Sequence, residues 1–338
     1  MSFNPDVTKS NFTGKFLSWG KLDYGTLQLN PEYQNKTVID LLEDADLNFQ
    51  VMLAQAHYKP AGSDVVIPSE GHIIYRADTM QELGYGVTSR YVPMSYPEIL
   101  EGFFQDIKQL GGIPSRVVGF DQGKRAAIQF LLPDEYYIAG VAHAPFFNLY
   151  SSHDTTMPIG GNSSNICIVC GNTMALSYSD KTLKFSIRHT RNASNRLAEI
   201  SNVIMRAREG NDEYAKTLGE FIRYPADFEF QKLFLNSLLP DPQVKPGEKV
   251  NQARANQREQ INVAIGVSAS ERNTSDVTIY DVFMGLTRYN SYRTQNRDDS
   301  RQFEYVNSGP GAELNASGFS WLKEYVAENQ PKLVVTMP

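Results

Sequence analysis

Basic residues gather in one stretch of a chain that is acidic overall. Between Lys181 and Arg208 the sequence has seven lysines and arginines and one acid, Glu199, whereas the whole chain carries a net charge of −6. Arginine forms paired hydrogen bonds with phosphate oxygens. The acidic total argues against a protein that coats duplex DNA, because phosphate neutralisation dominates affinity for nucleic acid. A separate basic face is still compatible with binding, and we predict that it includes Lys184, Arg188, Arg191 and Arg196.

A second group of arginines lies near the C-terminus. In the segment LTRYNSYR, Arg288 and Arg293 alternate with Tyr289 and Tyr292. Arginine beside tyrosine suits phosphate contact combined with base stacking. The alternative is that the tyrosines pack inward and the arginines are solvated. We include Arg288 and Arg293 among the predicted nucleic-acid-binding residues.

The segment SHDTT supports a different hypothesis. His153 and Asp154 could serve as an acid/base pair or as metal ligands, with His143 and His189 as partners. No HExxH or GxSxG motif accompanies them, so a structural loop is the competing interpretation. We therefore predict no catalytic residue and no metal site, and keep a metal-assisted hydrolase as an alternative.

The two cysteines have the CxxC spacing of a redox pair or half a zinc site. A zinc site needs two further ligands, and positions three apart on a strand point to opposite faces. We interpret Cys167 and Cys170 as buried structural thiols. The sequence has no GxGxxG or P-loop motif, so no cofactor is predicted.

The basic residues need a strand and a helix to position them. Residues 166–169 form a short apolar run typical of a buried strand. From Leu183 to Arg188 apolar and polar residues alternate, which predicts a half-buried strand with a basic solvent face. Apolar residues then recur at spacings of three and four, so we expect a helix from Asn192 to Arg208. Residues 151–164 are rich in glycine and serine, and a loop is predicted there.

The rest of the chain predicts an α+β fold. Ser95 and Glu98 form a capping box before a helix, and a hairpin follows around Asp121-Gln122-Gly123. Helical patterns dominate beyond Phe228. We expect a mainly antiparallel sheet backed by helices, with a helical C-terminal part. The predicted domains are an irregular N-terminal arm (1–37), an α+β core domain (38–239) and a helical C-terminal region packed on the core (250–338).

Several segments resemble a known family in the same order. IVCGNTMALS followed by FSIRHT is similar to paired segments of the phage/plasmid-like domain of unknown function 932. DLLEDADLNFQV, LGYGVTSRYVP, SHDTT, DVFMGLTRY and GPGAELNASGF extend the resemblance over about residues 38–325. The resemblance implies an origin in bacteriophages, plasmids or integrated elements. Such proteins are likened to single-strand annealing proteins of the RecT and Rad type, which carry DNA along a basic groove of a ring or filament.

Together these observations predict a mobile-element protein that binds single-stranded DNA, and that anneals strands as a homo-oligomer. The first residues contain no leader pattern and no run of 18 apolar residues occurs, so no membrane association is expected and the cytoplasm is the expected location. Besides the hydrolase, a non-enzymatic assembly or host-interaction protein is an alternative, because 18 tyrosines and 18 phenylalanines offer large anchors for a protein partner.

Overall fold

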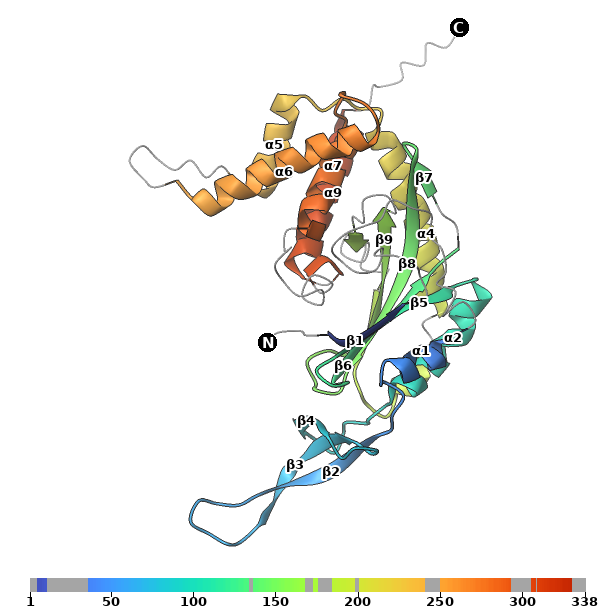
Figure 1. The fold of residues 1–338 in the computed structure, drawn as a ribbon, viewed down its shortest axis with the longest axis vertical. Helices are drawn as coiled ribbons and strands as arrows, with labels where there is room; N and C mark the ends of the chain where they lie inside the picture. The colour runs from blue at the N-terminus through green and yellow to red at the C-terminus, as the bar shows by residue number, and fades with distance from the viewer. Residues whose placement is uncertain are drawn as a thin grey trace.

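Antiparallel strands form the centre of the molecule (Figure 1). The computed structural model describes residues 5–10, 36–133, 136–167, 173–175, 184–197, 201–240, 250–292, 305–307 and 309–329. The larger sheet has the order β1-β5-β6-β8-β9-β10, with β11 also paired to β9 and β7 to β8. Its strands are β1 (Pro5–Ser10), β5 (Ile113–Phe120), β6 (Arg125–Leu131), β7 (Tyr136–Ile138), β8 (Val141–Ser152), β9 (Ile159–Cys167), β10 (Thr173–Ala175) and β11 (Lys184–Ile187).

Helices cover one face of this sheet. They are α1 (Val38–Asp44), α2 (Tyr96–Gln109), α3 (Ala193–Leu197) and the first half of α4 (Ser201–Phe221). Alternate residues of the strands, such as Val117, Ile128 and Phe147, pack against Phe103 and its neighbours on α2. The predicted capping box begins α2, because the Ser95 hydroxyl accepts from the Glu98 amide and the Glu98 carboxylate accepts from the Ser95 amide. Period-two strands and an amphipathic helix therefore share one apolar core.

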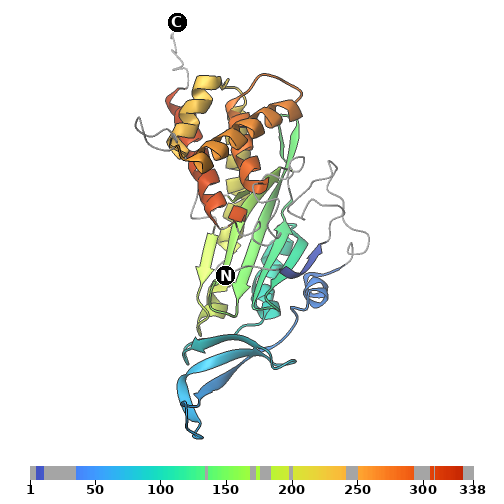
Figure 2. The ribbon, with the colours of Figure 1, turned by 60° about the vertical axis from the view of Figure 1, so that its left-hand side comes forward.

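The C-terminal helices form a second core at one end of the sheet (Figure 2). They are α5 (Phe228–Leu238), α6 (Gln252–Glu271), α7 (Ile279–Tyr292) and α9 (Pro310–Glu328). Helix α4 joins the two cores: Ile204 and Ala207 belong to the first, and Tyr214, Leu218 and Phe221 to the second. No helix within the described residues is long and apolar enough to cross a membrane.

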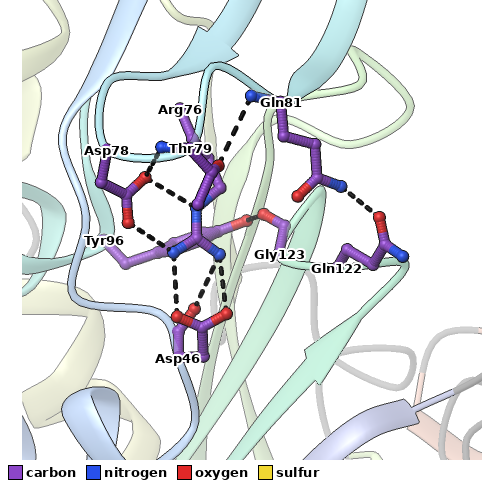
Figure 3. A network of polar contacts seen from close by, with 8 residues as sticks. All are labelled: Asp46, Arg76, Asp78, Thr79, Gln81, Tyr96, Gln122 and Gly123. Carbon is purple, nitrogen blue, oxygen red and sulfur yellow. Dashed lines mark hydrogen bonds and ion pairs between the residues drawn. The ribbon is translucent and has the colours of Figure 1, made fainter.

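A separate three-stranded sheet lies at the opposite end of the molecule from these helices (Figure 1). It consists of β2 (Val51–Tyr58), β3 (Ile67–Arg76) and β4 (Glu82–Val87). The buried guanidinium of Arg76 at the end of β3 donates to both carboxylate oxygens of Asp46 at 2.8 Å and to Asp78 at 2.8 and 3.0 Å (Figure 3). It also lies 4.0 Å from the ring centre of Phe49. These contacts fix the small sheet to the segment that follows α1.

The structure confirms the predicted α+β class, with antiparallel sheets and a helical C-terminal part. It also confirms the hairpin, in which Asp121, Gln122 and Gly123 all have positive φ angles between β5 and β6. Within the arm predicted to be irregular, β1 pairs with β5. A sheet edge offers unpaired backbone groups, and β1 supplies partners for those of β5.

The predicted loop at 151–164 is too long: β8 runs to Ser152 and β9 starts at Ile159, so only residues 153–158 form a loop. The loop was predicted too long because this segment is rich in glycine. Gly160 and Gly161 lie in β9 because the rings of Tyr150 and Phe185 occupy the places where side chains would stand. The predicted helix over 192–208 is instead α3 and α4, with residues 198–200 outside the described residues, and α4 continues to Phe221.

Candidate nucleic-acid interface

The basic strand has the alternation that the sequence predicts. In β11 the side chains of Phe185 and Ile187 face inward, and Phe185 lies 5.5 Å from the ring of Phe103 on α2. Lys184 is exposed, and so is Arg188 directly after the strand. One face of β11 therefore anchors it to the core, while the other presents positive charge.

Lys184 ends a polar row that crosses the sheet. It stands opposite Asn162 on β9, and the row continues through Asn148 on β8 and Gln129 on β6 to Arg116 on β5. Gln129 donates to Asn148 at 2.8 Å, and Asn148 donates to Asn162 at 3.0 Å. All members except Lys184 are buried. The basic face of β11 is thus the edge of a polar layer on the side of the sheet opposite α2.

Two more arginines follow the strand. Arg191 lies in the turn before α3 and Arg196 lies on α3, and both side chains are exposed. Ala193 between them is buried in the first core, so the start of α3 is held in place while Arg191 and Arg196 face solvent. Within the part of the chain that the structure describes, no carboxylate forms an ion pair with Arg188, Arg191 or Arg196. Their charge is available to an anion.

Arg188 lines a hollow of about 600 Å³, which we name the arginine hollow. Three segments far apart in the sequence build it: residues 85–91, 155–158 and 186–190. Its side chains include Arg90, an exposed Tyr85 and a half-buried Tyr91. The hollow therefore combines two arginines with aromatic rings. Arg191 and Arg196 do not line it.

Local contacts hold the walls of the arginine hollow in place. The Tyr91 amide donates to the Thr88 carbonyl at 3.0 Å, which closes a turn around Arg90. The Val92 amide donates to the His189 carbonyl at 3.2 Å, and the rings of Tyr91 and His189 stack at 5.1 Å. The segment that follows β4 is thereby tied to the segment that carries Arg188.

Strand β4 also approaches the 153–158 loop very closely. A Cβ atom at Gly84 would lie 2.4 Å from the carbonyl oxygen of His153. Only glycine allows this contact, because any side chain would overlap the loop backbone. Gly84 thus sets the distance between two walls of the arginine hollow.

His153 belongs to the floor beneath this loop rather than to an exposed catalytic pair. Its buried ring packs 4.5 Å from that of Tyr96 and 6.1 Å from that of Phe49. Burial, with a smaller effect from the neighbouring His189, lowers the pKa of His153 to about 3. Asp154 points elsewhere: its carboxylate lies 3.5 Å from Arg125 Nε and accepts from the Thr156 amide at 2.9 Å.

The other histidines of the hydrolase hypothesis are also buried. Burial lowers the pKa of His143 and of His189 to about 4. His143 Nδ1 lies 3.1 Å from the Asn165 amide oxygen, and its Nε2 lies 3.3 Å from the Tyr280 hydroxyl. Among the described residues, no three His, Cys, Asp or Glu side chains come together as a group that could hold a metal ion.

The remaining predicted residues do not reach the arginine hollow. Arg288 on α7 forms an ion pair with Glu271 at 2.6 Å, and its guanidinium lies 5.5 Å from the ring centre of Tyr292. Arg293 and Cys170 lie outside the described residues, and Cys167 is the last residue of β9. Arg188 and Arg90 are therefore the two arginines that the structure brings together in one hollow.

Sequence reasoning missed Arg90 and Tyr85. Both lie in LGYGVTSRYVP, and the hollow joins this segment to parts of SHDTTMP and FSIRHT. Three segments that carry the family resemblance thus meet at one place. The order of these segments in the chain could not show this, because the contact depends on how β4 approaches the loop between β8 and β9.

The family described as Domain of unknown function (DUF932) matches residues 85–307, about two thirds of the chain. All three segments around the arginine hollow fall within this match. Neither the curated proteins nor the solved structures contain a match to the chain.

Proposed function

We propose that this chain, which belongs to the DUF932 family, binds single-stranded DNA through Arg188, Arg191, Arg196 and the basic face of β11. The observation that supports the proposal is the exposure of these three arginines without a carboxylate partner among the described residues. Uncompensated arginines favour phosphate oxygens, which accept their paired hydrogen bonds.

Single strands suit this surface better than a duplex. The ring of Tyr85 is 77% exposed, so it can accept a stacked base beside the arginines. Base stacking on an aromatic side chain requires an unpaired base, which a duplex does not offer. We therefore expect tighter binding to a single-stranded oligonucleotide than to a duplex of the same length.

The decisive experiment is fluorescence anisotropy with a labelled oligonucleotide across a salt series. Each phosphate neutralised on a single strand contributes about 0.7 to the slope of log K against log salt concentration. Replacing Arg188, Arg191 and Arg196 by Ala should weaken binding at low salt and reduce the slope by about 2. An unchanged affinity and slope would refute the assignment of this surface.

A matched control separates a local effect from a change in net charge. Lys216, Arg223 and Lys232 are exposed on or after helices α4 and α5, away from the residues of the arginine hollow. Their triple replacement by Ala removes the same charge. We expect this control to leave the slope almost unchanged, because the three residues lie on or after helices α4 and α5, away from the arginine hollow, and charges beyond the screening length interact little.

Strand annealing is the activity that we propose for the bound state. The family resemblance implies this activity. Mixing two complementary labelled strands tests it. The wild-type protein should accelerate their pairing, and the Arg188/Arg191/Arg196 variant should not.

A further inference from the structure

Two neighbouring hollows share a wall but differ in charge. The arginine hollow has Arg90 and Arg188 in its lining, and none of the described residues that line it is an aspartate or glutamate. The adjoining hollow, of about 550 Å³, is lined by Lys124 and Arg125 together with Glu82, Asp121 and Asp154. Tyr85 and Thr155 line both. An anion is therefore favoured in the first hollow and opposed in the second.

We propose that the arginine hollow binds one nucleotide unit, with its phosphate between Arg90 and Arg188 and its base against Tyr85. The inference rests on the proposed function, because Arg188 belongs both to the basic surface and to the nucleotide site. It adds which part of the strand this surface would bind. The volume of about 600 Å³ lies in the range of small-molecule sites, whereas a strand that only crosses a basic surface needs no such hollow. Arginine and an exposed aromatic ring are the two groups that bind phosphate and base.

Two residues that line the arginine hollow each have a buried polar atom without a hydrogen-bond partner among the described residues. His189 is 7% exposed and lines the hollow, and its Nδ1 has no hydrogen-bond partner among the described residues. The same holds for the hydroxyl of Tyr91. A buried polar atom without a partner is costly. A sugar hydroxyl or a base edge that enters the hollow would supply the missing hydrogen bond.

Other groups of the hollow fit the same ligand. The ring of His189 is fixed on its other side, where Nε2 lies 3.3 Å from the hydroxyl of Ser151, and by its stack on Tyr91. Thr88 and Thr190 add hydroxyl groups to the lining. The chemistry is that of a phosphate next to a planar base, either in a free nucleoside monophosphate or within a strand.

The test compares free deoxythymidine monophosphate with an oligothymidylate, both titrated into the full chain by calorimetry and by NMR. Arg90→Gln should weaken the binding of both ligands by about tenfold or more, because a charged hydrogen-bond donor is lost. Arg191→Gln should weaken only the oligonucleotide, since Arg191 does not line the hollow. Tyr85→Ala should weaken both, and Tyr85→Phe should not. Arg223→Gln is the neutral control.

The outcomes separate this inference from the proposed function. If the oligonucleotide binds but the mononucleotide does not, or if Arg90→Gln has no larger effect than Arg223→Gln, the nucleotide site is wrong and the basic surface stands. If the mononucleotide binds and the oligonucleotide does not, the hollow is a site for free nucleotides and the proposed function fails. Binding of neither ligand overturns both. Because Arg90 and Tyr85 are exposed, these variants are expected to fold.

Discussion

Acidification should destabilise this protein through its three buried histidines. His143, His153 and His189 are 1%, 0% and 7% exposed, and burial lowers their pKa values to about 4, 3 and 4. In the unfolded chain each imidazole has an ordinary pKa near 6.5. Between these values the unfolded state binds more protons than the folded state, so stability is present above pH 6.5 and is lost as the pH falls.

The expected size follows from this difference in proton binding. Lowering the pH from about 7.5 to about 5.5 should cost a little over 1 kcal/mol for each histidine and roughly 4 kcal/mol for the three together. The result depends little on the folded-state values, because a group with a pKa of 3 or 4 stays almost unprotonated at pH 5.5. Asp46 and Asp78, whose pKa values are lowered mainly by hydrogen bonds from Arg76, titrate below their ordinary value of 3.8 and do not contribute in this window.

Urea unfolding followed by circular dichroism at the two pH values measures the loss. The matched variant is His153→Phe, which keeps an aromatic ring between Phe49 and Tyr96 but removes the titrating group. Its own loss on acidification should be smaller than that of the wild type by a little over 1 kcal/mol, whatever the baseline effect of the substitution. Equal losses in both proteins, or a total loss well under 1 kcal/mol, would show that these histidines are not buried in the neutral form.

Two further substitutions test how the walls of the arginine hollow are held. Arg76→Met should lower the free energy of unfolding by roughly 2–4 kcal/mol, because the substitution removes four charged hydrogen bonds of a buried guanidinium. The loss is limited because the two aspartates are partly exposed and regain water. Urea unfolding measures this, and a loss below 1 kcal/mol would contradict it. Gly84→Ala should cost roughly 1–3 kcal/mol and weaken mononucleotide binding, since a Cβ would meet the His153 carbonyl. Gly219→Ala on α4 has open space around it and should be neutral or stabilising, so equal effects of the two alanines would refute the role of Gly84.

Local patterns were sufficient for the basic strand. The alternation around Phe185 and Ile187 needs only a period of two, and the structure gives the expected burial. The capping box at Ser95 is likewise a contact between neighbours in the chain. Glycines in β9 failed the same kind of reasoning, because their strand conformation depends on rings from β8 and β11 that the sequence does not place.

The arginine hollow, the proposed binding site, could not be predicted from local sequence patterns. Arg188 could be selected because it stands in a dense basic stretch, but Arg90 is a single arginine in a mixed segment. It becomes part of the site only when the Arg76 ion pairs fix the small sheet and Gly84 lets β4 approach the 153–158 loop. Conversely, Arg288 was predicted to bind nucleic acid because it stands beside tyrosines in the sequence, but Glu271 on the preceding helix already forms an ion pair with it. Tertiary contacts therefore determine which arginines have no carboxylate partner among the described residues.

The acidic total of the chain is compatible with the proposed binding at this surface, because an acid beside the arginine hollow is already paired. Asp154, beside the arginine hollow, faces Arg125, which also pairs with Asp121. At physiological salt, charges farther away than about 8 Å are largely screened. A strand that approaches β11 therefore meets the field of Arg90, Arg188 and Arg191 rather than the net charge of −6. High salt should weaken this field as it screens every exposed arginine, whereas stacking on Tyr85 should persist, so the binding that remains at high salt should depend on Tyr85.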